Sequence, residues 1–293
     1  MRTRVVFALV VLALIVVVIL PITFWYRRLH PARVAVDDDP GRHGIAYEPV
    51  SFASAIDGAP LRGWYMASPH ATGRAIVLVP GLDNNRLVSG IALRLAPSLL
   101  AAGFDVLTFD LRGEGESGGE PITWGAHEQW DVLGAVREVQ ARGARRVGVL
   151  GFSLGGASSI LAAARSPDIV ALVVESAFAD LTTVFTRQLA DGYHLPSPVV
   201  DYGLALYRWL SGTDPADVSP VRVIGAIAPR PVLIIQGAAD ETVPVSDSDQ
   251  LLAAAGPGTE RWLVAGGRHA ESYYTDETAY ASRVTGFFNA AMP

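Results

Sequence analysis

The chain has 293 residues, a net charge of −6 and no cysteine. The lack of cysteine excludes a domain held together by disulfides, and an acidic chain without a basic cluster is not typical of a nucleic-acid-binding protein. No pair of histidines has metal-ligand spacing and no glycine-rich phosphate loop occurs, so the sequence predicts neither a metal nor a cofactor.

The first distinctive segment is an apolar run over residues 5–20, which an aromatic cluster and two arginines follow at residues 24–28. A helix of about 22 residues rises about 33 Å, enough to cross a bilayer, and aromatic side chains at its end are typical of a membrane interface. We therefore predict a membrane anchor over residues 1–28, with the lipid bilayer as partner of residues 5–26 and a single-pass membrane location. A cleaved signal peptide is the alternative, although no small-residue cleavage site follows the run closely. Arginines flank both ends of the run, so the sequence leaves the orientation open.

Residues 29–46 show no core-forming pattern, and we predict a solvated linker there. The acidic run at residues 37–39 lacks the spaced oxygen ligands and the terminal glutamate of a calcium loop. The remaining residues, 47–293, are enough for one globular domain and contain no visible repeat.

Within this domain, short apolar runs alternate with helical patterns. The first two runs, at residues 50–54 and 61–67, are separated by Asp57-Gly58 and predict an antiparallel hairpin. Further strands are predicted at residues 75–79, 104–110, 146–150, 171–175, 230–237 and 261–265, and helices at residues 89–102, 126–142, 156–165, 246–255 and 277–290. The alternation predicts the α/β class, with a mostly parallel sheet that helices cover on both faces.

The sequence Gly151-Phe152-Ser153-Leu154-Gly155 lies between a predicted strand and a predicted helix. A serine between two such elements, with a glycine two positions away on either side, is the pattern of a nucleophile elbow. The turn is sharp, and a side chain at either glycine would collide with the neighbouring strand or helix. We therefore predict that Ser153 is a catalytic nucleophile, held at the carboxyl edge of the sheet.

One segment interrupts the alternation. Residues 181–229 contain no strand pattern and are rich in aromatic residues compatible with helices, a connection far longer than usual. An insertion at this point would lie over the strand ends, so we predict a small helical cap that shapes an acyl-binding pocket with Tyr202, Tyr207 and Trp209. A peripheral helical pair packed on the sheet edge is the alternative.

A serine hydroxyl needs a general base to attack a carbonyl group, and the base needs an orienting acid. Asp240 follows one predicted strand, and His269 follows the next strand and a pair of glycines. We predict His269 as the base and Asp240 as the acid. Glu175, which also lies at a strand end, is the alternative acid.

The tetrahedral intermediate needs backbone amides that stabilise its oxyanion. One predicted donor is the amide of Leu154, directly after the nucleophile. The other is the amide of Leu82, in the loop over residues 80–86 that follows an earlier strand. An ordinary strand-to-helix turn is the alternative interpretation of that loop.

From residue 47 to its end, the chain resembles the α/β-hydrolase superfamily, and within it the serine hydrolases with a short cap that include serine aminopeptidase-like and dipeptidyl-peptidase-like esterases. The resemblance rests on the elbow, on the order of nucleophile, acid and histidine, and on an Asp-x-Arg-Gly-x-Gly-x-Ser pattern at residues 110–117. It implies the α/β-hydrolase fold. Two positions depart from the pattern, because Pro80 and Glu114 each stand where the family usually has histidine.

Together these features predict a membrane-anchored serine hydrolase that cleaves an ester or related acyl bond of a small-molecule substrate through an acyl-enzyme, as a carboxylesterase does. A serine peptidase or aminopeptidase is an alternative, because fold alone does not fix function. A non-catalytic binding protein is a second alternative, against which the complete set of Ser153, Asp240 and His269 argues. The sequence leaves the acyl length and the oligomeric state open.

Overall fold

The computed structural model of the chain describes residues 3–7, 9, 15–70 and 72–293. In this described part, eight strands form one sheet in the order β1-β2-β4-β3-β5-β6-β7-β8. Strands β1 and β2 form the antiparallel hairpin, β2 also pairs antiparallel with β4, and the other pairs are parallel. The strands are β1 Glu48–Ala53, β2 Pro60–Met66, β3 Arg74–Val79, β4 Phe104–Phe109, β5 Arg146–Phe152, β6 Ile169–Glu175, β7 Val232–Gly237 and β8 Thr259–Val264.

Helices cover both faces of this sheet. Alternate residues of β3 enter two different cores: Val77 packs with α4 (Glu128–Ala141) and α5 (Leu154–Arg165), and Ile76 packs with α3 (Ile91–Ala101) and α10 (Glu277–Ala291). Successive side chains of a strand point to opposite faces, so a run that is apolar at every position is buried on both. The helix α9 (Val245–Ala254) contributes Leu251 to the first core. The expected sheet, mostly parallel and covered by helices on both faces, is confirmed.

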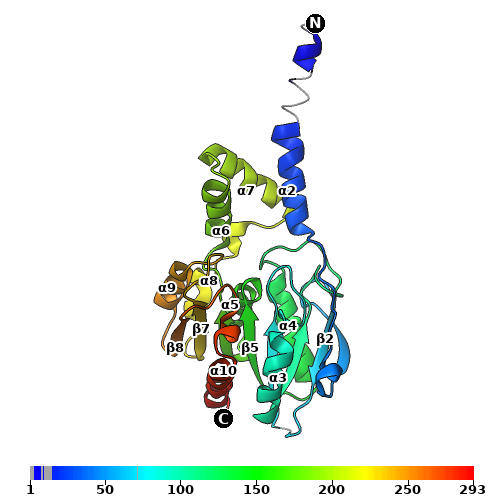
Figure 1. Cartoon of the computed structure of the whole chain (residues 1–293), viewed down its shortest axis with the longest axis vertical. Coiled ribbons are helices and arrows are strands. Elements are labelled where there is room, and N and C mark those ends of the chain that lie inside the picture. Colours follow the sequence, from blue (N-terminus) through cyan, green and yellow to red (C-terminus); the bar gives the residue numbers. More distant parts are fainter. Residues whose placement is uncertain (1–2, 8, 10–14, 71) are drawn as a thin grey trace.

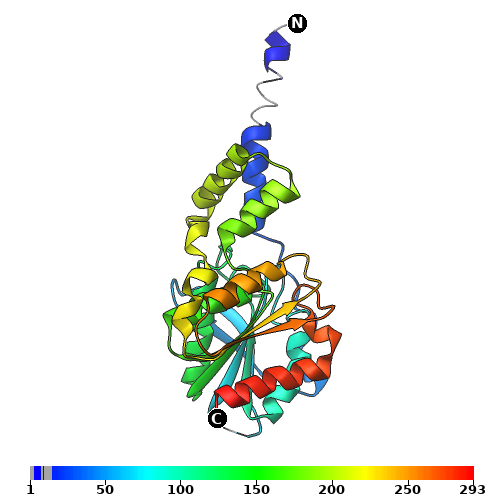
Figure 2. The ribbon, with the colours of Figure 1, turned by 90° about the vertical axis from the view of Figure 1, so that its left-hand side faces the viewer.

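The segment between β6 and β7 leaves the sheet at the carboxyl end of β6 and contains no strand before the amino end of β7. Figures 1 and 2 show α6 and α7 standing away from the sheet, next to α2 (Leu20–Leu29). Its elements are α6 Leu181–Arg187, the π-helical η3 Gln188–Gly192, α7 Ser197–Ser211, the 3-10 helix η4 Pro215–Asp217, α8 Pro220–Val223 and the 3-10 helix η5 Ile224–Ile227. We call α6, η3 and α7 the cap helices.

The N-terminal segment differs from the prediction. Among the residues that the structure describes, no helix is both long and apolar enough to cross a bilayer, so the predicted transmembrane helix and single-pass location are wrong. Residues 8 and 10–14 of the apolar run lie outside the described part. The run continues as a short π helix, η1 (Ile15–Ile19), and then as the ten-residue helix α2 (Leu20–Leu29).

The aromatic residues that follow the apolar run explain this error. Trp25 is only 2% exposed, and its ring lies 4.8 Å from that of Phe185 in α6 and 5.3 Å from that of Tyr207 in α7, centroid to centroid. Leu29 is also buried, and its carbonyl oxygen accepts a hydrogen bond of 2.9 Å from the Ile122 amide. Trp25, one of the three aromatic residues that suggested a membrane interface, therefore lies in a protein core shared with the cap helices.

Candidate active site

Ser153 lies in the sharp turn between β5 and α5. Its backbone φ is 50° and its ψ is −117°, a strained conformation that residues other than glycine rarely adopt. A Cβ atom at Gly151 would lie 2.5 Å from the Gly155 carbonyl oxygen, and one at Gly155 would lie 2.2 Å from that of Pro80. Both positions therefore require glycine if β3, β5 and α5 are to meet this closely.

The structure brings Ser153, His269 and Asp240 together from three separate strand ends. The Ser153 Oγ atom lies 2.9 Å from His269 Nε2, and His269 Nδ1 lies 2.9 Å from Asp240 Oδ2 and 3.0 Å from Oδ1. This spacing suits a neutral imidazole that donates from Nδ1 to the carboxylate and accepts the serine proton at Nε2. The His269 side chain keeps 26% of its surface exposed, whereas that of Asp240 is fully buried.

Asp240 is held as a carboxylate by the loop that follows β7. Its Oδ1 accepts from the amides of Thr242 at 2.9 Å and Val243 at 2.8 Å, and its Oδ2 accepts from Gln236 Nε2 at 3.1 Å. Burial acts to raise the pKa of Asp240, but the hydrogen bond and charge of His269 and the amide of Val243 outweigh it and leave that pKa below its ordinary value. Gln236, the polar residue at the end of an apolar strand, was not singled out from the sequence, although that position was a usable signal.

Glu175, the alternative acid, is engaged elsewhere. Its Oε1 accepts from the Ser272 amide at 2.8 Å and its Oε2 from the Tyr280 hydroxyl at 2.6 Å. Complete burial raises the pKa of Glu175, against the effect of these hydrogen bonds. Its backbone carbonyl accepts from the Ser153 amide at 2.8 Å, so Glu175 supports the turn of the elbow.

The two segments that carry the predicted oxyanion donors flank Ser153. Leu154 is the first residue of α5, so its amide has no acceptor within the helix and lies at the positive end of the helix dipole. Leu82 follows Gly81, where a Cβ atom would lie 3.2 Å from the Ser153 Cβ. The loop after β3 therefore passes directly beside the serine, with Pro80 close enough to contact Gly155.

The motif at residues 110–117 is held by two buried ion pairs. Asp110 accepts from the Arg86 guanidinium and also from the Arg86 amide at 2.7 Å, which ties the loop after β4 to the loop after β3. Arg112 pairs with Asp131 of α4 at 2.8 Å. Both aspartates are fully buried, and removing one partner of such a pair is strongly destabilising. In this arrangement the motif connects loops rather than acting on a substrate.

The three cap aromatics predicted to line a pocket have different environments. Tyr207 is completely buried and its hydroxyl donates to the Thr123 carbonyl at 2.9 Å. Tyr202 donates its hydroxyl to the Val17 carbonyl at 2.8 Å, and Trp209 is 71% exposed. Residues two positions apart on a helix lie on nearly opposite sides, so Tyr207 and Trp209 do not line the same surface. In the described part of the chain, no group of three or more His, Cys, Asp or Glu residues could hold a metal ion.

Comparisons with known proteins agree with this architecture. The sequence profile described as alpha/beta hydrolase fold matches residues 74–193. The uncharacterized protein YqkD of Bacillus subtilis is 29% identical over 240 residues, which cover 79% of this chain and 76% of that protein. The uncharacterized protein Rv2307c of Mycobacterium tuberculosis is 32% identical over 219 residues, which cover 73% and 69% of the two chains.

Among solved structures, the Pyrococcus furiosus esterase Pf2001 superposes with a TM-score of 0.75 at 24% sequence identity, over 90% of this chain and 98% of that one. At this identity the superposition shows a shared fold. The strand order of this chain and the position of the elbow between β5 and α5 agree with that fold. The chain therefore belongs to the α/β-hydrolase fold family, and hydrolysis is the class of reaction that this membership supports.

Proposed function

We propose that the protein is a serine hydrolase that cleaves an ester bond through an acyl-enzyme, with Ser153 as nucleophile, His269 as general base and acid, and Asp240 as the residue that orients the histidine. The observation that carries this proposal is the line of hydrogen bonds from Ser153 Oγ to His269 Nε2, 2.9 Å, and from His269 Nδ1 to Asp240 Oδ2, 2.9 Å. Each contact has the length that proton transfer or histidine orientation requires.

In the first half of the reaction, Ser153 Oγ attacks the carbonyl carbon of the substrate while its proton passes to His269 Nε2. The carbonyl oxygen becomes an oxyanion, which the amides of Leu82 and Leu154 stabilise in this proposal. The protonated histidine then donates its proton to the leaving oxygen. The bond between carbonyl carbon and leaving oxygen breaks, and the acyl group stays on Ser153.

In the second half, water takes the place of the serine hydroxyl. The water oxygen attacks the acyl carbon while His269 accepts a proton from the water. When the ester bond to the serine breaks, His269 gives that proton to Ser153 Oγ. The carboxylic acid leaves, and the enzyme regains its starting protonation state. Asp240 stays ionised throughout, because its pKa lies below the ordinary value.

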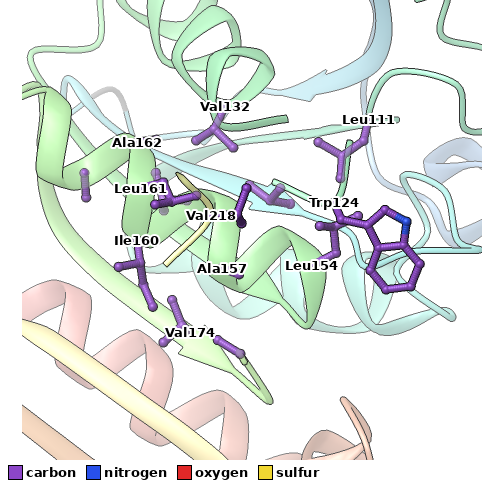
Figure 3. Packing of buried hydrophobic residues seen from close by; sticks show 14 of the residues in the cluster. Leu111, Trp124, Val132, Leu154, Ala157, Ile160, Leu161, Ala162, Val174 and Val218 are labelled. Atoms are coloured by element: carbon purple, nitrogen blue, oxygen red, sulfur yellow. The ribbon is translucent and has the colours of Figure 1, made fainter. Parts of the chain in front are cut away.

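An apolar acyl substrate is favoured by the surroundings of the nucleophile. Leu154, directly after Ser153, belongs to a hydrophobic cluster that also contains Trp124 (Figure 3). Phe185 belongs to the same cluster. Leu82 packs against the same cluster. The nucleophile therefore lies next to an apolar core, and on this ground we propose an uncharged acyl group rather than a charged peptide end.

The test is a comparison of matched p-nitrophenyl esters with aminoacyl p-nitroanilides, using the full chain. We expect turnover of the esters with little or none of the anilides, and loss of ester turnover in Ser153→Ala. Ser282→Ala serves as the control, because Ser282 is exposed on α10. Preferential turnover of the anilides supports a peptidase instead, and full ester turnover by Ser153→Ala contradicts the mechanism.

A further inference from the structure

Glu114 is a buried carboxyl group that the proposed mechanism does not use. Its side chain is completely shielded from solvent, and its Oε1 accepts a hydrogen bond of 2.8 Å from the Asp83 amide. Among the described residues, no group hydrogen-bonds to its other oxygen, Oε2, which is also buried. A buried polar atom without a partner is costly, so a position that retains one calls for an explanation.

The hydrogen bond from the Asp83 amide to Glu114 bears on the site, because Asp83 follows two residues of the loop beside Ser153. Asp83 follows Leu82, the proposed oxyanion donor, and Gly81, which lies against Ser153. The Asp83 backbone has a φ of 52°, in the left-handed region that non-glycine residues occupy at some cost. The hydrogen bond to Glu114 compensates for this strain and fixes the direction of the peptide chain directly after the donor.

Glu114 itself is held firmly enough to position another loop. Its amide donates to the Leu111 carbonyl at 3.1 Å, and its carbonyl accepts from the Ser117 amide at 3.0 Å. Arg33, from the segment between α2 and β1, donates to the Gly115 and Ser117 carbonyls. The two backbone bonds therefore close the turn that carries Glu114, and Arg33 connects this turn to the segment between α2 and β1.

The ionisation of Glu114 suits a site beside a developing negative charge. Burial raises its pKa to about 8, and the charges of Asp83 and Asp110 act in the same direction, against the Asp83 amide and the charge of Arg33. At neutral pH the group is therefore mostly a neutral carboxylic acid. A neutral acid still accepts the Asp83 amide through its carbonyl oxygen, and it adds no negative charge next to an oxyanion.

We propose that Glu114 is a positioning residue for the oxyanion hole, in which its Oε1 holds the Asp83 amide so that the Leu82 amide points at the substrate oxygen. The inference rests on the proposed function, because it assumes that Ser153 is acylated. It also explains why this position accepts glutamate: the essential feature is a buried carbonyl acceptor, which glutamine would also supply and leucine would not.

The test compares Glu114→Gln with Glu114→Leu on a short p-nitrophenyl ester at pH 7. We expect the glutamine variant to keep kcat within about threefold of wild type, whereas the leucine variant loses about 10- to 100-fold in kcat with KM little changed, because a misaligned donor weakens only the transition state. A trifluoromethyl ketone inhibitor, which forms an oxyanion on Ser153, should bind the leucine variant correspondingly more weakly.

A purely structural role gives a different result. If the leucine variant has a lower melting temperature but unchanged kcat and inhibitor affinity, or if both variants lose kcat equally, the inference is overturned. If the leucine variant does not fold, hydrogen exchange decides: slow exchange of the Asp83 amide in both wild type and Glu114→Gln supports the proposal, and fast exchange in either contradicts it. Failure of the proposed function is distinguishable, because it appears as undiminished activity in Ser153→Ala.

Discussion

The proposed catalytic centre and the region formed by α2 with the cap helices are held in place by different forces. Around Ser153, backbone hydrogen bonds connect the loops, such as the Ser153 amide to the Glu175 carbonyl at 2.8 Å and the Ala239 amide to the Gly267 carbonyl at 2.9 Å. Around Trp25, aromatic side chains from segments far apart in the sequence hold helices together. Backbone hydrogen bonds, together with polar side chains such as Gln236 and Glu114, hold the loops around Ser153. The cap region depends instead on a few large aromatic side chains.

This difference predicts opposite responses to substitution. Changes of catalytic side chains should alter the rate of reaction with little effect on the melting temperature, because the frame stays intact. Changes of buried aromatic residues in the cap region should lower the melting temperature first.

The largest effect is expected at the triad acid. Asp240→Asn keeps the shape of the side chain but presents the wrong partner to His269 Nδ1, and by analogy with such changes in other triads kcat should fall by about 10⁴-fold. Steady-state kinetics and thermal unfolding check this, with a melting temperature close to that of wild type. The matched variant Glu175→Gln should lose far less activity, since Glu175 bonds to Ser272 and Tyr280 instead. The reverse order of the two losses assigns the acid to Glu175.

The next effect is one of stability. Trp25→Ala removes a buried aromatic side chain from the core that α2 shares with the cap helices, which costs about 3–5 kcal/mol of the free energy of unfolding when the cavity does not collapse. Trp209→Ala is the matched control, because Trp209 is 71% exposed, and it should change the free energy of unfolding little. Denaturant titration measures both. Equal stability of the two variants shows that α2 does not pack on the cap helices in solution.

The smallest predicted effect is a pH dependence of stability at Glu114. Its pKa is raised to about 8 in the folded protein from an ordinary 4.5, so the folded state holds a proton that the unfolded state has lost between these values. Glu114 therefore lowers the stability of wild type progressively as pH rises from about 4.5 to 8. Thermal unfolding at several pH values should show that the stability of Glu114→Gln increases relative to that of wild type as pH rises across that range. A constant difference between the two proteins contradicts a raised pKa.

The order and placement of the proposed catalytic residues could be predicted because each lies at a strand end marked by local sequence. Ser153 has its two glycines, and His269 follows a strand and a double glycine. In the structure these side chains meet, and their catalytic roles stay predictions. The loop that holds Asp240 was also visible in the sequence, whereas its partner Gln236 was overlooked.

The role of Trp25 could not be predicted, because length and hydropathy do not distinguish burial in lipid from burial in protein. Its partners Phe185 and Tyr207 lie more than 150 residues away in the sequence, and no local pattern connects them. The same limit applies to α7, where the face that carries Tyr207 could not be told from the face that carries Trp209 without knowing how the helix packs. Glu114 was visible as a departure from the family pattern, but its contact with Asp83 depends on two loops meeting.

The most direct test of the central proposal is to locate a covalent adduct. A fluorophosphonate probe should react with the full chain, and peptide mapping by mass spectrometry should find the modification on Ser153, because this hydroxyl lies 2.9 Å from His269 Nε2. We expect one adduct per chain, which is absent in Ser153→Ala and slow to form in Asp240→Asn. Modification of a different serine, or equal labelling of wild type and Ser153→Ala, would contradict it.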